Sequence, residues 1–430
     1  MLKTQCLPCL ISLDLFIDQF YNKAVLIRKA YRYRLKTKPK HEAKFRQFAG
    51  SCRFVWNKSL ALQKELLAKG ERCLSYCKLA GLLKQWKSQP ETLFLNEAAH
   101  SQSLQQTLKS LMRAIYDAFD KSNPKHFPVF KKKGVHDSFC YPQGFKINGN
   151  AVYLPKIGWI PFYKSRAIEG EPKNITVSRR AEHWYISIQV ELEVPNPVHP
   201  STSSVGLDMG IAHFAAFDDG TFIEALNVFR KLEDALARQQ RKLSGMVKFS
   251  KNWFKQKAKI ARLHIRIADT RNDFLHKHST AISKNHALVM LEALKVSNMS
   301  ASAKGTIEAP GKNVKAKSGL NKAILDQGWS EFRRILEYKL LWRGGMVVEV
   351  PPQHTSQKCP VCHFISAGNR KSQAVFRCID CGYTANADTV AAMNIKAAGH
   401  AVLACGEMAQ QCRSVKQEPP RANGSGILSL

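Results

Sequence analysis

Two Cys-x-x-Cys pairs in the last quarter of the sequence form its most specific chemical pattern. Cys359 and Cys362 make the first pair, and Cys378 and Cys381 make the second after fifteen intervening residues. Each pair is typical of a turn that directs two thiolates at one point, and four thiolates complete the tetrahedral shell of zinc. Because no coordination position stays open, such an ion is structural and not catalytic. We therefore predict one zinc ion in a ribbon at about residues 354–384.

Other interpretations of paired cysteines are a redox dithiol and coincidence. A single pair, such as Cys6 and Cys9, would leave both open, and there we favour coincidence. His363 adjoins a predicted ligand, but four thiolates already saturate the zinc, so we interpret it as a surface residue. The twelve cysteines show no pattern of a secreted disulfide framework, which favours a reducing cytoplasm.

Three acidic residues stand in surroundings where an acid needs an explanation. Asp208 lies in the apolar run VGLDMG, Glu292 lies in ALVMLEAL, and Asp388 begins the helical run that contains TVAAMNIKAAG. Burying a carboxylate costs several kcal/mol unless it is paired or bound to a metal. For each acid alone, a salt bridge or a helix cap is a sufficient explanation. Together, the three acids suggest a shared site.

The chemistry that three converging carboxylates support is phosphodiester cleavage. The reaction needs both the attacking and the leaving oxygen to be stabilised, which two Mg²⁺ ions about 4 Å apart can do. Carboxylate oxygens are the ligands that Mg²⁺ prefers. We predict that Asp208, Glu292 and Asp388 are catalytic and hold two magnesium ions, if the fold brings them together.

The N-terminal half must supply a separate domain. Residues 25–35 alternate apolar and basic side chains, as in a half-buried strand, and helical patterns occupy about 40–125. Short strand-like runs between 127 and 195 favour a small antiparallel barrel. We therefore predict a barrel over 25–195 interrupted by a helical domain, followed by a linker at 196–204. Residues 1–24 differ in character and form a predicted N-terminal extension, with the native start at Val25 as one hypothesis.

The C-terminal half must position the acids. We expect a strand from 204 to 217, an Asp-Gly turn and a further strand, then two antiparallel helices over 226–284 that break near Ser244 and Gly245. Strands at 287–294 and 346–350 flank a helix predicted for 322–343. The domain is predicted to span 205–400 and to carry the zinc ribbon as an insertion. Residues 401–430 are predicted to be a largely disordered tail. The fold class is α+β with several domains.

Net charge identifies the class of partner. The chain carries 66 Lys and Arg against 33 Asp and Glu, a formal net charge of +33. Repulsion among so many like charges destabilises a compact protein unless a polyanion neutralises them. Nucleic acid is such a polyanion, and its binding is also favoured by the release of counterions. A membrane surface is the alternative, but no basic amphipathic helix or spanning segment dominates the sequence.

The ordered motifs resemble the TnpB (OrfB-type) proteins of bacterial insertion sequences. These motifs are AYRYRL, GSCRFVWNKSLALQ, GLDMG, MLEALKVSNM, HTSQKCPVC, CIDCGYTANAD and AAMNI. The resemblance covers about residues 25–400. It implies an RNase H-like (RuvC) nuclease in which a guide RNA pairs with double-stranded target DNA, with the barrel acting as a wedge-like domain. Asp208 would then be the first RuvC acid, in contact with both metals, and Glu292 and Asp388 the second and third. The implied location is the bacterial cytoplasm at the nucleoid, and we favour a monomer.

The sequence also departs from the family pattern near the third acid. Asn386 and Ala387 replace a usual Asp-Arg pair, Val390 replaces a usual asparagine, and Ala293 follows the second acid where Asp is usual. One alternative function is therefore an inactive RNA-guided repressor. Another is a transposase, or an accessory factor, in DNA transposition and recombination, although the chain shows no HUH pair with a partner tyrosine.

Overall fold

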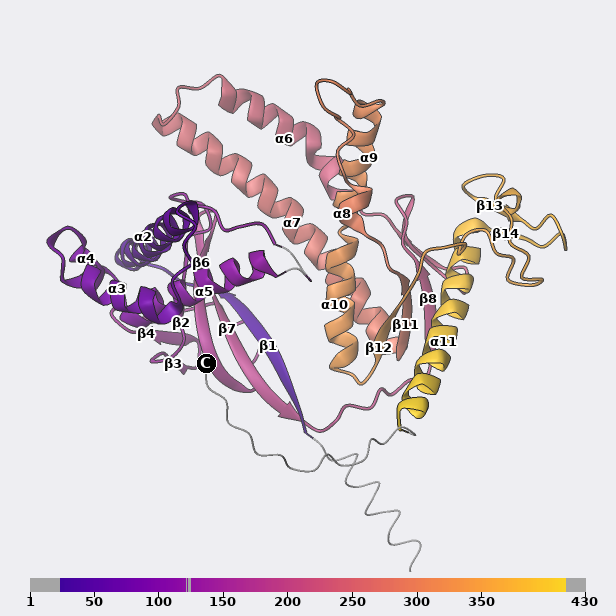
Figure 1. Ribbon diagram of the computed structural model, residues 1–430, viewed down its shortest axis with the longest axis horizontal. Coiled ribbons are helices and arrows are strands. Elements are labelled where there is room, and N and C mark those ends of the chain that lie inside the picture. Colours follow the sequence, from indigo (N-terminus) through magenta and orange to yellow (C-terminus); the bar gives the residue numbers. More distant parts are fainter. Residues whose placement is uncertain (1–23, 121, 123–124, 415–430) are drawn as a thin grey trace, which may run out of the picture. The chain divides into compact units, whose positions relative to one another are not determined.

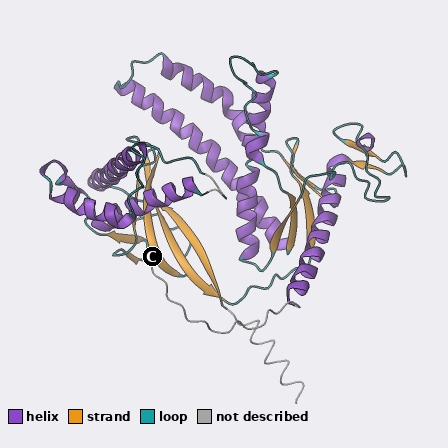
Figure 2. Ribbon diagram, viewed as in Figure 1, coloured by secondary structure: helices purple, strands orange, loops and turns teal. Residues whose placement is uncertain are grey.

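The computed structural model describes residues 24–120, 122 and 125–414, and side chains only as far as 405. These residues form two compact units, which divide between Asn196 and Pro197. Both combine helices and strands, so the protein is of mixed α and β structure (Figures 1 and 2). Cys6, Cys9 and the predicted N-terminal extension up to residue 23 lie outside the described residues.

The first unit is built on an open antiparallel sheet. Its four strands follow the order β1 (Val25–Arg34), β7 (His183–Val194), β6 (Glu171–Arg180) and β2 (Ser138–Tyr141). A second sheet holds β3 (Lys146–Asn148), β4 (Ala151–Leu154) and β5 (Gly158–Pro161), and a single bridge from Leu35 to Phe162 links β1 to β5. The described strands form no closed barrel, which corrects the prediction. Strands of three and four residues such as β3, β4 and β5 are too short to close the ring.

Helices inserted between β1 and β2 cover this sheet. They are α2 (Pro39–Ala68), α3 (Tyr76–Ser88), η1 (Pro90–Thr92), α4 (Phe94–Ala98) and α5 (Ser101–Phe119). Phe45 of α2 packs 5.0 Å from Trp184 of β7, and Phe48 packs 5.1 Å from Phe139 of β2, measured between ring centroids. One hydrophobic core therefore joins the helices to the strands.

The second unit contains a five-stranded mixed sheet. The order is β10 (Phe222–Glu224), β9 (His213–Phe217), β8 (Ser204–Asp208), β11 (Leu288–Glu292) and β12 (Met346–Val350). β8, β11 and β12 are parallel, whereas β9 runs antiparallel to both of its neighbours. The single strand predicted for 204–217 is therefore two strands. The chain reverses between Asp208 and His213, where a Cβ atom at Gly210 would lie only 2.9 Å from the carbonyl oxygen of His213.

Helices cover both faces of this sheet. α6 (Val228–Ser244) and α7 (Lys251–Asn285) form a hairpin between β10 and β11, and α8 (Val296–Met299), α9 (Val314–Gln327) and α10 (Trp329–Leu341) lie between β11 and β12. Val289 and Leu291 of β11 pack with α7 and α10, whereas Met290 packs with Ile395 of α11 (Ala387–Ser414). This alternation places β11 between the two helical layers (Figure 1).

Two helix predictions need correction. The helix predicted for 322–343 is interrupted at Gly328, whose φ of +75° ends α9 and starts α10. The predicted tail is helical from 401 to 414, because α11 continues through it and Leu403 packs against the sheet core. Residues 415–430 lie outside the described part of the chain.

Within the described residues, no helix combines the length and the apolar character that crossing a membrane would require.

Candidate active site and metal centre

Two of the predicted acids lie at the ends of neighbouring strands. β8 and β11 pair in parallel with Leu207 opposite Leu291, and the next residues are Asp208 and Glu292. The carboxyl ends of parallel strands meet at the same edge of a sheet. The strand register therefore gathers these two carboxylates at one edge.

The third acid reaches this edge because α11 packs tightly on β8. A Cβ atom at Gly206 would lie only 2.1 Å from the carbonyl oxygen of Ala392, so only glycine permits this approach. Asp388 lies in the first turn of α11, where the side-chain oxygen of Asn386 accepts hydrogen bonds from the backbone N–H of Asp388 (2.9 Å) and of Thr389 (3.3 Å). Asn386 thus caps the helix and fixes the backbone that carries Asp388.

Electrostatic interactions show that the three carboxyl groups lie near one another. Burial, followed by the negative charges of Glu292 and Asp388, raises the pKa of Asp208 to about 7. Burial also raises the pKa of Glu292, against a hydrogen bond from Thr355 and the positive charge of Arg370. The charges of Glu292 and Asp388 act on Asp208 in this way because both acids lie close to it. The fold brings together the three acids that the sequence singled out.

Arg370 belongs to this site, although sequence reasoning missed it. Its guanidinium lies 3.3 Å from a carboxylate oxygen of Asp388, and it also donates a hydrogen bond to the carbonyl of Gln373. The same positive charge opposes the rise that burial causes in the pKa of Asp208 and of Glu292. Among 66 basic residues, nothing in the local sequence distinguishes this one.

Thr355 is a second residue without a sequence signal. Its hydroxyl donates a hydrogen bond to Glu292. Its backbone carbonyl accepts a hydrogen bond from the buried side chain of Asn394 on α11, at 2.8 Å. The loop that leads to Cys359 is thereby held between β11 and α11.

The four predicted zinc ligands form a compact cluster. The sulfur atoms of Cys359, Cys362, Cys378 and Cys381 all lie within 4.8 Å of one another. Cys359 and Cys381 are 3.6 Å apart, and Cys362 and Cys378 are 3.5 Å apart, between sulfur atoms. Zinc–sulfur bonds of about 2.3 Å in a tetrahedron imply sulfur separations of roughly 3.8 Å. The cluster therefore fits a zinc ion.

Local structure explains how the ribbon forms this cluster. Two tight turns hold the pairs: the N–H of His363 donates to the carbonyl of Cys359, and the N–H of Gly382 donates to that of Cys378. The short strands β13 (Val375–Arg377) and β14 (Thr384–Asn386) then lead into α11, and η2 (Ala367–Asn369) precedes Arg370. The side chain of His363 is exposed, as predicted for a surface residue.

The acidic cluster differs from the cysteine cluster in its spacing. In the described part of the chain, the four cysteines are the one group of three or more potential ligands whose donor atoms all lie within 4.8 Å. Asp208, Glu292 and Asp388 do not form such a group.

Three families of known proteins match parts of this chain. A family described as "Probable transposase" matches residues 187–303, and one described as "Cas12f1-like, TNB domain" matches residues 329–395. These matches include all three acids, Arg370 and the four cysteines. A "Helix-turn-helix domain" family matches residues 27–72, where the structure has β1 and the long helix α2.

Full-length relatives make the assignment more specific. The chain is 54% identical to "Putative RNA-guided DNA endonuclease InsQ" of Escherichia coli, over 91% of this chain and 97% of the relative. It is 33% identical to "Putative RNA-guided DNA endonuclease" of Streptomyces pristinaespiralis, over 94% of this chain and 99% of the relative. The chain belongs to the TnpB (OrfB-type) family.

A solved structure shares the fold. The protein in "Cryo-EM structure of the Cas12f1-sgRNA-target DNA complex" superposes with a TM-score of 0.53 at 15% identity, over 86% of this chain and 99% of that one.

Proposed function

We propose that this protein is an RNA-guided DNA endonuclease that hydrolyses phosphodiester bonds at Asp208, Glu292 and Asp388. The observation that carries the proposal is the gathering of two carboxylates around Asp208 at one sheet edge, where burial, followed by the negative charges of Glu292 and Asp388, raises the pKa of Asp208 to about 7. Three partly buried acids in one place are unfavourable unless cations neutralise them, and Arg370 supplies only one positive charge. The names of the two full-length relatives support the same activity.

The acids are suited to hold divalent metal ions, which we propose to be two Mg²⁺. Carboxylate oxygens are hard ligands of the kind that Mg²⁺ prefers. When bound, the metal would supply Lewis-acid stabilisation of the attacking and leaving oxygens of the phosphate. The charges of both other acids act on Asp208. We therefore assign Asp208 as a ligand of both ions, and Glu292 and Asp388 as ligands of one ion each.

Other residues of the chain position this machinery. Thr355 orients the carboxylate of Glu292 through its hydroxyl, and the Asn386 cap orients Asp388. Arg370 lies beside Asp388 with a guanidinium that suits an anionic phosphate. It is therefore placed to stabilise the negative charge that develops on the phosphate during cleavage.

The zinc ribbon acts as the support for Arg370. We propose one Zn²⁺ held by Cys359, Cys362, Cys378 and Cys381, because the site is closed and its ligands are all thiolates. The ion would fix a segment too small to have a large core of its own.

The proposed partners are a guide RNA and double-stranded target DNA, and we propose a monomer. The net charge of +33 supports polyanionic partners. We also propose that the second unit is an RNase H-like (RuvC) domain, because two acids end adjacent parallel strands and a helix brings the third. The sheets of the first unit would serve as the wedge-like domain.

An inactive repressor is the alternative that the departures from the family pattern raised. Val390, one of these departures, is fully buried with Phe376 and Cys378 in the small core between the ribbon and α11. Its side chain fills that core and is not part of the acidic cluster. Asn386, another departure, caps α11. Both positions therefore fit an active site, which favours the endonuclease over the repressor.

The test is a cleavage assay with the RNA that copurifies with the full-length protein. A DNA duplex matching that RNA should be cut in the presence of Mg²⁺ by the wild type and not by Asp208→Asn. The matched control is Asp234→Asn on α6, an exposed acid whose loss should leave cutting unchanged. Binding of the duplex without cleavage by the wild type would establish the repressor instead, and joining of DNA strands would establish a transposase.

A further inference from the structure

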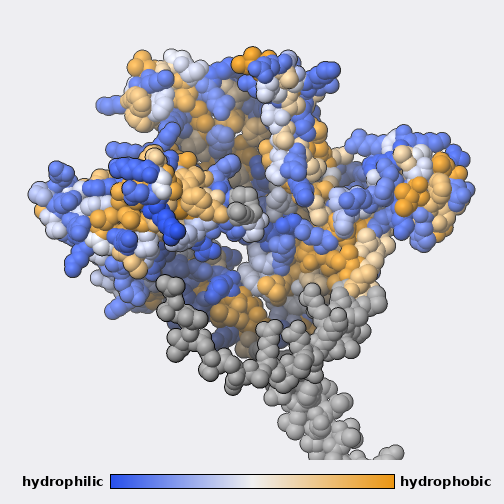
Figure 3. All heavy atoms as spheres, in the orientation of Figure 1, coloured by the Kyte–Doolittle hydropathy of each residue, from blue (hydrophilic) through white to orange (hydrophobic). Residues whose placement is uncertain are grey.

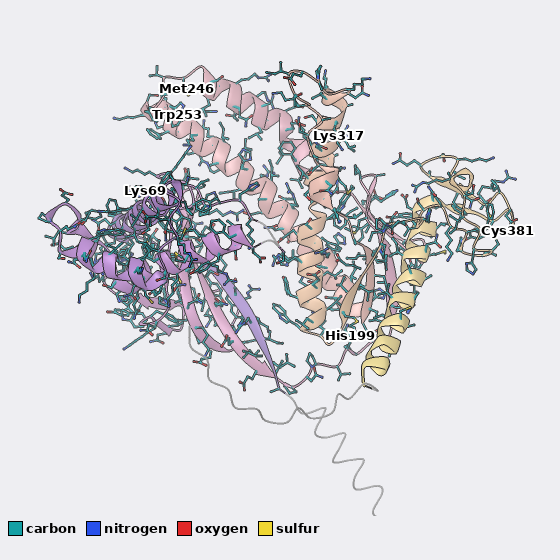
Figure 4. The ribbon with its side chains drawn as sticks, viewed as in Figure 1. Lys69, His199, Met246, Trp253, Lys317 and Cys381 are labelled. Atoms are coloured by element: carbon teal, nitrogen blue, oxygen red, sulfur yellow. The ribbon has the colours of Figure 1, made fainter. Side chains whose placement is uncertain are left out.

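The hairpin of α6 and α7 ends in a turn that exposes aromatic side chains. Phe249 is 74% exposed and Phe254 is 54% exposed. The ring of Trp253 lies 5.5 Å from that of Phe249 and 5.1 Å from that of Phe254, between centroids. Figure 4 shows Met246 and Trp253 at the end of this hairpin. We name residues 247–254 the aromatic tip. Exposed aromatic clusters of this kind mark binding surfaces.

The aromatic tip is held in one conformation. Ser250 caps α7 by accepting a hydrogen bond from the backbone N–H of Trp253 at 3.1 Å. The buried side chain of Gln256 donates to the backbone and side-chain oxygens of Gln239 and so fastens α7 to α6. Phe249 has a φ of +67°, a left-handed conformation that residues other than glycine rarely adopt. Such strain persists at sites whose geometry serves binding.

Positive charge surrounds the aromatic tip. Residues 235–268 include ten Lys and Arg and no Asp or Glu. The ammonium group of Lys257 lies 5.0 Å from the centre of the Trp253 ring. Between α6 and α7, a groove of about 440 Å³ is lined in part by Gln239, Lys259 and Arg266. Figure 3 shows hydrophilic and hydrophobic residues side by side over this hairpin. The partner must therefore be anionic and must also offer flat apolar surfaces.

Unpaired nucleotides combine these two properties. Their phosphates are anionic, and their bases expose faces that stack on aromatic rings. A duplex presents phosphates but keeps its base faces stacked inside, so it would leave the three rings without a function. A second copy of the chain would bring two strongly basic hairpins together, which like-charge repulsion opposes.

We propose that the aromatic tip binds unpaired nucleotides of RNA, with bases stacked on Phe249, Trp253 and Phe254 and phosphates along the basic hairpin. This inference rests on the proposed function for the presence of an RNA partner. RNA is favoured over the target DNA because exposed apolar rings need lasting cover, which a resident partner supplies and a transient substrate does not.

The test measures RNA binding by the full-length protein after removal of its copurified RNA. The probes are a fluorescent oligouridylate of roughly a dozen nucleotides, a DNA strand of the same length, and an RNA duplex. The variants replace Phe249, Trp253 and Phe254 together by leucine, which keeps apolar surface but removes stacking. Trp253→Phe is the matched control, because it keeps an aromatic face.

The expected result is a selective loss of single-strand binding. The leucine variant should bind oligouridylate at least about tenfold more weakly, since stacking contributes on that order per base. Its affinity for the duplex and its melting temperature should stay at wild-type values, and Trp253→Phe should retain most of the affinity. RNA carrying a photoreactive uridine should crosslink to the peptide that contains residues 247–254.

Several outcomes would overturn the inference. Unchanged oligouridylate affinity in the leucine variant, or no crosslink to this peptide, removes the binding site. A tip-dependent preference for the DNA strand assigns the surface to DNA. If the leucine variant loses only self-association, the aromatic tip binds a second copy of the chain. If it loses only binding to anionic lipid vesicles, the aromatic tip binds a membrane. If the wild type cuts no DNA but the leucine variant still loses RNA affinity, the proposed function is wrong, whereas RNA binding by the aromatic tip is confirmed.

Discussion

The hydroxyl of Thr355 donates a hydrogen bond to the carboxylate of Glu292, which joins the loop before the first zinc-ribbon cysteine to the end of β11. Asn394 of α11 holds the same loop through the carbonyls of Thr355 and Lys358, at 2.8 and 2.7 Å. The helix that carries Asp388 thus also positions the residue that orients Glu292. The positions of two of the three acids, Asp388 and Glu292, therefore depend on α11.

Replacing Thr355 by valine should slow DNA cleavage while leaving the fold intact. A hydrogen bond to a charged group contributes about 1.5–3 kcal/mol, so we expect cleavage to slow by about ten- to a hundredfold. In the wild type this hydrogen bond lowers the pKa of Glu292. Its loss should raise that pKa, so the pH at which activity appears should move upward. A pH–rate profile checks this, with Thr355→Ser as the control that keeps the hydroxyl. A valine variant with wild-type rate and profile would show that Thr355 has no positioning role.

Stability without divalent metal should fall as pH rises towards neutrality. The pKa of Asp208 is raised from 3.8 to about 7 in the folded protein. Between these values the folded protein binds a proton that the unfolded chain has released, so this contribution is fully present below the lower value and is lost as pH rises through the higher one. Melting temperatures measured in magnesium-free buffer between pH 5 and 8 should show this fall.

The controls for that measurement are Mg²⁺ and Asp208→Asn. Added Mg²⁺ should raise the melting temperature most at the higher pH, because the ionised acids are then free to bind it. The asparagine variant removes the titrating group and should flatten the pH dependence. An equally steep dependence in the variant would mean that other groups cause it.

The candidate acids and cysteines stand out in the sequence, because an acid in an apolar run and a double Cys-x-x-Cys pattern are local signals. The meeting of the acids could not be predicted, since it depends on the pairing of Leu207 with Leu291 and on the close contact at Gly206. Arg370 was missed because its role arises only once the ribbon folds against Asp388. These are relations between distant segments, and no local pattern encodes them.

The fold predictions failed where local patterns were ambiguous. A glycine within a helical pattern is compatible with a continuous helix, so the break at Gly328 was not foreseen. Strand-like runs between 146 and 161 predict strands but not whether those strands close a barrel. By contrast, the break between α6 and α7 near Gly245 follows from the sequence and is confirmed.

Loss of the zinc ligands should unfold the ribbon and abolish cleavage together. Cys378→Ser removes one thiolate from a cluster whose four sulfur atoms lie within 4.8 Å. Because metal binding supplies the folding energy of such segments, the variant should contain no stoichiometric zinc, and Arg370 should lose its place beside Asp388. Metal analysis and limited proteolysis check this. Cys77→Ser, at an exposed cysteine outside the cluster, should keep both zinc and activity. A zinc-free Cys378 variant that still cuts DNA would separate the ribbon from the reaction.

Substituting alanine for Gly206 should separate α11 from β8. The added Cβ would meet the carbonyl oxygen of Ala392 at 2.1 Å and the Cβ of Lys396 at 2.8 Å, and backbone cannot yield as a flexible side chain can. Overpacking of this kind costs about 1–3 kcal/mol or more, and the shift of α11 would carry Asp388 away from Asp208. Cleavage should therefore fall further than the melting temperature alone would suggest. Gly81→Ala in α3 is the matched control, because its Cβ would meet nothing within 4 Å and should stabilise the helix by up to about 1 kcal/mol. Full activity in Gly206→Ala would mean that the contact between α11 and β8 does not set the position of the third acid.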